Sequence, residues 1–165
     1  MVKVTGGSNR RVSLAALIAV KPGHRPRLIY RVHHARRRRN DQRKGFTETG
    51  YALLLDAAHQ QLGGPLVVVW DNSSTHISGA MTALIAARDW LTVYRLPPYA
   101  HELNPVEPVW SHLKRSLANL AKRNLTQLPT LIKTRLRRMQ YRPGLLDGFL
   151  ASTGLELTPF CNSRN

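Results

Sequence analysis

The feature that most restricts the fold of this chain is a short, continuous apolar run that stops at a carboxylate. The run, PLVVVW at 65–70, is rich in β-branched residues, and Asp71 follows it directly. A second apolar run, LTVYRL, occupies 91–96, and residues 78–90 between the two runs can form a helix. Both runs are typical of strands buried on both faces, as in parallel sheets joined by crossover helices. The order strand, helix, strand predicts a parallel pair.

The segments on either side of this unit complete an α/β pattern. VSLAALIAV at 12–20 and RLIYRV at 27–32 flank KPGHRP, which predicts a hairpin with a Pro-Gly turn. Helical spacing follows at 46–62, where Thr47 is a candidate N-cap and a Gly-Gly pair ends the helix, and it returns in two later segments. We expect one α/β domain in which helices flank a mixed sheet.

The apolar run at 12–20 also resembles the core of a secretory signal, because basic residues precede it. No small-residue cleavage site separates this run from Lys21, so a buried strand is the better interpretation. No apolar run reaches the length needed to span a bilayer. The single cysteine, Cys161, excludes a disulfide framework within the chain. We therefore expect a cytoplasmic protein without a membrane association.

Basic residues greatly outnumber acidic ones. The 165 residues include 25 Lys and Arg against 9 Asp and Glu, a formal net charge of +16. A polyanion would relieve the self-repulsion of such a chain, which favours nucleic acid over an acidic membrane surface or an acidic protein. Two clusters are candidate DNA contacts: Arg36, Arg37, Arg38 and Arg39 in a loop, and Lys114, Arg115, Lys122 and Arg123 in a helical segment. Charge runs are often merely solvated, but the second cluster can follow a phosphate backbone.

Asp71 is the most unusual of the nine carboxylates, because it ends an apolar strand. A turn or helix cap built on the Asp71 side chain explains it about as well as a functional role does. Glu107 lies in the most distinctive segment, LPPYAHELNPVEPVW at 96–110, where Asn104 can cap a helix that begins near Pro105. Capping does not explain why two carboxylates bracket one strand and loop. Paired carboxylates are hard oxygen ligands for Mg²⁺ or Mn²⁺, which activate nucleophiles in phosphodiester chemistry.

WDNSSTH at 70–76, followed by LPPYAHELNPVEPVWSHLKR at 96–115, resembles the DDE-type transposases of the mariner-related bacterial insertion-sequence branch. The resemblance runs from about Val12 to the last helices and implies a ribonuclease-H-like catalytic domain over residues 1–150, with a tail at 151–165. It implies that Asp71 and Glu107 are the second and third acidic residues of a triad. These residues hold Mg²⁺ or Mn²⁺ for DNA strand cleavage and strand transfer in that family.

The chain departs from the family pattern at its start. The family's first acidic residue lies on a strand before the hairpin, but residues 1–11 contain no Asp or Glu, and no helix-turn-helix precedes them. Asp41 and Glu48 come after the hairpin, where they cannot substitute. We therefore expect the chain to be the C-terminal portion of a transposase. We expect its fold to lack the first strand and the protein to be inactive alone. His76 and His112 receive no catalytic role.

Three interpretations stay open at this point. The first is an incomplete transposase catalytic domain that binds transposon ends and target DNA in a bacterial nucleoid. The second is a non-catalytic DNA-binding remnant that modulates an intact transposase. The third is one part of a frameshifted product. The corresponding protein partners are a second copy of the chain or an upstream-frame product.

Overall fold

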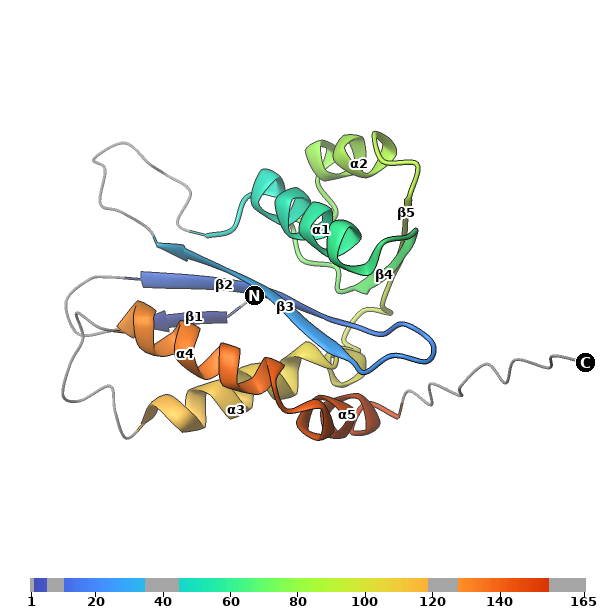
Figure 1. Ribbon diagram of the computed structural model, residues 1–165. Helices are drawn as coiled ribbons and strands as arrows, with labels where there is room; N and C mark the ends of the chain where they lie inside the picture. Colours follow the sequence, from blue (N-terminus) through green and yellow to red (C-terminus); the bar gives the residue numbers. More distant parts are fainter. Residues whose placement is uncertain (1, 6–10, 35–44, 119–127, 155–165) are drawn as a thin grey trace, which may run out of the picture.

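The computed structural model describes residues 2–5, 11–34, 45–118 and 128–154 of the 165-residue chain (Figure 1). Strands β1 (Val2–Thr5), β2 (Arg11–Ala19) and β3 (Arg27–His34) form an antiparallel sheet in the order β1-β2-β3. The turn between β2 and β3 contains Gly23 at a φ of 74°, a left-handed conformation that glycine adopts without steric cost. The hairpin predicted from the sequence is confirmed.

The antiparallel sheet has one strand more than the predicted hairpin. We expected the strand before the hairpin to be missing. Strand β1 instead pairs with β2 from Val2 opposite Leu14 to Thr5 opposite Arg11. It is four residues long and contains no Asp or Glu. The structure therefore supplies a strand at this place, but not the carboxylate that the family pattern puts on the strand before the hairpin.

Strand β2 separates two hydrophobic cores. Val12 and Leu14 belong to a core formed with helices α3 (Val106–Ala118), α4 (Leu128–Gln140) and α5 (Pro143–Ala151). Ala15 and Ala19 belong to a second core on the opposite face. Successive side chains of a strand point to opposite faces, so the continuous apolar run of β2 follows from burial on both sides. Figure 1 shows α1 on one side of the sheet and α3, α4 and α5 on the other.

The second core joins α1 (Glu48–Leu62) to a two-stranded parallel sheet made of β4 (Leu66–Trp70) and β5 (Leu91–Arg95). Helix α1 begins where the Gly50 N–H donates to the side chain of Thr47, as predicted, and it ends at Gly63. The crossover helix α2 (Gly79–Ala86) connects the two strands. The mixed α/β class, with both antiparallel and parallel strand pairs, is confirmed.

The prediction that β4 and β5 are buried on both faces was wrong. Leu66 and Trp70 point into the second core, whereas Val67 and Val69 are 69% and 57% exposed. Tyr94 on β5, which pairs in register with Val69, is 59% exposed. Helices α3, α4 and α5 pack on the antiparallel sheet, not on this pair, so the outer face of β4 and β5 has no cover among the described residues.

Candidate active site

Asp71 follows the last residue of β4 and forms the turn that the sequence suggested. Its Oδ1 accepts hydrogen bonds from the Ser73 backbone N–H at 3.1 Å and from His76 Nδ1 at 2.9 Å. The hydrogen bond from His76 is the main reason that the pKa of Asp71 falls to about 2, against the opposing effect of partial burial. The carboxylate is therefore ionised at neutral pH. The second oxygen, Oδ2, has no partner among the described residues.

His76 orients this carboxylate. The residue is 8% exposed, and its ring stacks on Trp70 at 4.3 Å between ring centroids and meets Tyr51 edge-on at 4.7 Å. Its Nδ1 lies near two acceptors, Asp71 Oδ1 and, at 3.1 Å, the Asp71 carbonyl oxygen, so Nδ1 carries a proton. Burial and the charge of Asp71 raise the pKa of Tyr51 to about 12. His76 is thus a positioning residue with a fixed ring plane.

No catalytic role for His76 was predicted from the sequence, although its position inside WDNSSTH was a usable signal for a supporting role. A histidine five residues after a strand-end aspartate, next to a tryptophan, can fold back on both when the intervening residues form a turn. The His76 N–H bonds to the Ser73 carbonyl oxygen at 2.8 Å, which closes that turn. The His76 ring also contacts Tyr51, which lies on α1, and this contact was not predictable from the motif.

Asn72 joins the Asp71 turn to the segment that leads to Glu107. Its side-chain amide donates to the Leu96 carbonyl oxygen at 2.8 Å, and the Leu96 N–H donates to the Trp70 carbonyl oxygen at 2.8 Å. These two bonds hold the chain after β5 beside the chain after β4. Both segments leave the carboxyl ends of parallel strands, the edge at which α/β sheets bind ligands.

The segment after β5 reaches Glu107 through a tightly wound loop. Tyr99 has a φ of 66° and is 88% exposed, and a 3₁₀ turn, η1 (His101–Leu103), follows it. The Asn104 side chain then accepts the Val106 N–H at 3.1 Å, which confirms the predicted cap of α3. Glu107 lies in the first turn of this helix and is half-buried. Its carboxylate has no hydrogen bond or ion pair with another described residue.

Asp71 and Glu107 are connected through neighbouring loops, and no interaction joins the two carboxylates directly. The described part of the chain contains no group of three or more His, Cys, Asp or Glu residues that could hold a metal ion. Two carboxylates still suit Mg²⁺, which proteins commonly hold through one or two carboxylates together with substrate phosphates and water. The ionised Asp71 with a free Oδ2, and the unpaired Glu107, fit that donor set.

Only part of the predicted basic surface can be placed. Lys114 and Arg115 are exposed on α3, seven and eight residues after Glu107. The other predicted DNA contacts, Arg36, Arg37, Arg38, Arg39, Lys122 and Arg123, lie outside the described residues, as do Asp41 and Cys161. None of the described helices is long and apolar enough to cross a membrane.

The element order and the acidic turn after β4 define an α/β domain with a charged site at the edge of a parallel strand pair. The sequence narrows this class to one family. The model of the DDE superfamily endonucleases matches residues 7–132, most of the chain, and the chain belongs to this family. This confirms the resemblance to the DDE-type transposases at the level of the superfamily, and the roles of Asp71 and Glu107 stay predictions. No curated protein matches the sequence.

Several solved structures resemble the chain at 12% sequence identity. For the Mos1 transposase catalytic domain with Raltegravir and Mg, the TM-score is 0.48, and the match covers 95% of this chain and 82% of that one. For the catalytic domain of Mos1 mariner transposase, the TM-score is 0.42 with 89% and 83% covered. For the Mos1 transposase paired-end complex with left transposon end, the TM-score is 0.43 with 87% and 55% covered.

Proposed function

We propose that this chain carries two metal-ligating carboxylates, Asp71 and Glu107, of a ribonuclease-H-like transposase domain that cuts and joins DNA strands. The observation that carries the proposal is the Asp71 carboxylate, which is ionised, oriented by His76 and free at Oδ2 at the carboxyl end of β4. Membership of the DDE superfamily endonucleases supplies the reaction class. When bound, Mg²⁺ or Mn²⁺ would activate the attacking water or hydroxyl and stabilise the leaving oxygen.

The residues of the chain have distinct tasks in this proposal. His76 and the Ser73 N–H bind one oxygen of Asp71 and leave the other for the metal. Glu107 provides a second oxygen donor from the first turn of α3. Lys114 and Arg115 face solvent on the same helix and contact backbone phosphates of the DNA, transposon ends and target alike.

We further propose that the chain does not turn over by itself. Strand β1 has no carboxylate, and residues 1–40 contain no Asp or Glu, so these residues do not supply the first acidic residue of the triad. We propose an upstream-frame product as its source. A second copy of the chain is a further protein partner, but its β1 has the same sequence and therefore the same lack of a carboxylate. In either case, the place of action is the bacterial nucleoid, where the DNA substrate lies.

Metal binding tests the site independently of turnover. We expect titration with Mn²⁺ to show one binding event in the full chain that is lost in Asp71→Asn and weakened in Glu107→Gln. Asp147→Asn is the matched control, since Asp147 is an exposed carboxylate on α5 that is outside the proposed site. Equal Mn²⁺ affinity in the wild type and in Asp71→Asn would refute the assignment.

The alternative function, a DNA-binding remnant without catalysis, is supported by the absence of the triad's first carboxylate from β1. It predicts binding that weakens steeply with salt and does not depend on Mg²⁺. A nicking assay on supercoiled DNA separates the two functions. The chain alone is tested for cleavage that depends on Mg²⁺ and is abolished by Asp71→Asn. Such cleavage would exclude the function of a DNA-binding remnant, and it would also contradict our proposal that the chain is inactive alone.

A further inference from the structure

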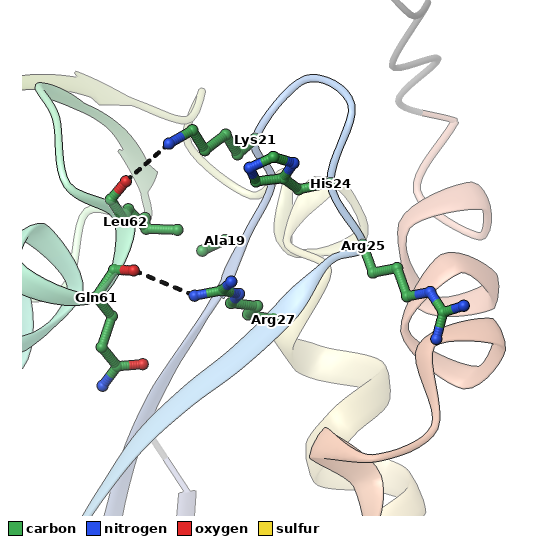
Figure 2. A pocket seen from close by; sticks show the side chains of 7 residues that line it. All are labelled: Ala19, Lys21, His24, Arg25, Arg27, Gln61 and Leu62. Carbon is green, nitrogen blue, oxygen red and sulfur yellow. Dashed lines mark hydrogen bonds between the residues drawn. The ribbon is translucent and has the colours of Figure 1, made fainter.

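A small cavity lies on the opposite end of β4 from Asp71, where the turn between β2 and β3 meets the last turn of α1. Its volume is about 70 Å³, a little more than the share of two water molecules in the liquid. It is lined by Ala19, Lys21, His24, Arg25, Arg27, Gln61 and Leu62. Figure 2 shows the basic residues coming from the hairpin and the other wall coming from the helix. None of the seven lining residues is acidic.

Two of the basic residues are fixed by backbone groups of α1. Lys21 Nζ donates to the Leu62 carbonyl oxygen at 3.0 Å, and Arg27 Nη1 donates to the Gln61 carbonyl oxygen at 3.1 Å (Figure 2). Such bonds satisfy carbonyl groups that a helix leaves without partners at its C-terminus. They also hold the two cationic groups on the same side of the cavity.

The bonds to the end of α1 leave most of the positive charge and most of the N–H donors of the basic lining residues without a partner in the described part of the chain. Lys21, Arg25 and Arg27 carry three positive charges, whereas a helix C-terminus is equivalent to about half a negative charge. Lys21 has three N–H donors and Arg27 has five, and the helix accepts one from each. The side chains of His24 and Arg25 have no partner among the described residues. The cavity therefore keeps an excess of positive charge and unused donors.

We propose that this cavity binds a phosphate group of the DNA backbone, at a second contact that is separate from the carboxylate site. Lys21 and Arg27 form the fixed part of the contact. His24 lies beside Lys21, and the Arg25 side chain, which also lines the cavity, extends away from them and is exposed (Figure 2). The proposal rests on the proposed function only in taking DNA as the partner.

The position of the cavity suits a DNA-positioning contact. The Gly63-Gly64 pair leads from this end of α1 into β4, and Asp71 follows the far end of that strand. Five residues of strand span about 17 Å, comparable to the rise of about five base pairs of B-DNA. A phosphate held here would fix the register of a duplex relative to Asp71, without reading its sequence.

The test uses the full chain and compares two double variants of equal charge loss. Arg25→Gln/Arg27→Gln removes cations from the cavity, and Lys133→Gln/Arg138→Gln removes two exposed cations from α4. Binding of a labelled DNA duplex is measured by fluorescence anisotropy over a series of salt concentrations. Amide chemical shifts of Gly23, Gly63 and Gly64 are followed by NMR during titration with inorganic phosphate.

We expect phosphate to shift the amide signals of Gly23, Gly63 and Gly64 in the wild type and in the α4 variant, but not in the cavity variant. We also expect the cavity variant to bind DNA with a salt slope lower by about 0.9, the change expected for one lost phosphate contact. Absence of these shifts in the wild type would overturn the proposal. If phosphate binds but the salt slope of DNA binding is the same in the cavity variant and the wild type, the cavity binds free phosphate, and the proposed DNA contact is wrong.

Two further controls separate this result from other causes. Arg25→Gln alone removes a side chain that makes no bond to α1, so it should weaken DNA binding without lowering the melting temperature. If only variants that lose a bond to α1 affect binding, the cavity is a helix cap and the proposal fails. We expect these variants to leave Mn²⁺ binding at Asp71 unchanged, so that loss of either site is detected without loss of the other.

Discussion

Strands β2 and β4 are both short runs of apolar residues, yet the protein covers them differently. On β2, Leu14 is fully buried against α3, α4 and α5, and Ala15 is buried against the α1 side. On β4, Trp70 is buried, but Val67 and Val69 are mostly exposed. The sequences alone gave no warning of this difference, and if anything β4 is the more apolar of the two.

The difference shows that an apolar run reports a strand, but not the number of layers that cover it. Two cores meet on β2, because α1 packs on one of its faces and α3, α4 and α5 pack on the other. The β4 and β5 pair is held from one side only, and polar contacts between α1 and the α2 region add to that core. The exposed face and the acidic turn with Asp71 belong to the same pair of strands, so the less covered region carries the proposed chemistry.

The largest difference in stability between variants of the two strands is expected for a substitution at Leu14 on β2. Leu14→Ala would leave a cavity between β2 and the three C-terminal helices, which costs about 2–5 kcal/mol of unfolding free energy. Val69→Ala removes atoms that are already mostly in water and should cost far less. Urea denaturation followed by circular dichroism measures both. Similar losses in the two variants would show that β4 is as well covered as β2.

Much of the fold followed from the sequence for a local reason. The hairpin, the parallel pair and the helix starts at Thr47 and Asn104 depend on turn and cap residues that act within a few positions. Strand β1 was missed because a four-residue strand gives too little pattern to recognise. The exposed face of β4 was missed because coverage depends on where distant helices pack, which no local pattern encodes.

The second effect concerns the ion pair that holds the partly covered region together. Arg88 Nε donates to Asp56 Oδ1 at 2.7 Å and Arg88 Nη2 to Oδ2 at 3.0 Å, which lowers the pKa of Asp56. A lowered pKa in the folded state stabilises the protein above the unfolded pKa of about 4, and this gain disappears as the pH falls through the folded value. Asp56 is partly exposed, so the effect is at most about 1 kcal/mol.

The measurement compares the wild type with Asp56→Asn by chemical denaturation at pH 7 and near pH 3. The wild type should be more stable at pH 7, and its advantage should shrink at the lower pH. Asp147→Asn, which removes an exposed carboxylate on α5, is the control and should give no such difference. An advantage that is independent of pH would mean that Arg88 does not act through the charge of Asp56.

The candidate site was predictable to the same local extent. Asp71 stood out because it follows an apolar strand, and Glu107 because it follows a capping motif and occupies the third acidic position that the resemblance implies. The roles of His76 and Tyr51 depend on two rings that meet across the fold, and only the structure brings them together. The cationic cavity was also missed, since its charge comes from a turn that looked like ordinary hairpin chemistry.

A smaller effect is expected from the turns that follow strands in the two regions. The turn after β2 has Gly23 at φ 74°, whereas the loop after β5 has Tyr99 at φ 66°. The left-handed conformation costs a non-glycine residue about 1–2 kcal/mol, and glycine loses about 0.5–1 kcal/mol more conformational freedom on folding. Because Tyr99 is 88% exposed, Tyr99→Gly should raise stability by about 0.5–1 kcal/mol in thermal and urea unfolding. A loss of stability would show that the tyrosine ring packs on the loop.

The smallest effect tests the exposed face of β4 itself. Val69→Thr keeps the β-branched shape that favours a strand and replaces one methyl group with a hydroxyl, so on a solvated face it should change stability by less than about 0.5 kcal/mol. The same change at Val12, which is 2% exposed on β2, buries the hydroxyl and should cost about 1–3 kcal/mol. Both values come from urea denaturation of the isolated chain. A cost at Val69 as large as that at Val12 would mean that the outer face is covered in solution, either by a second copy of the chain or by another segment of the same chain. Gel filtration would then separate these two explanations, because only a second copy changes the apparent size.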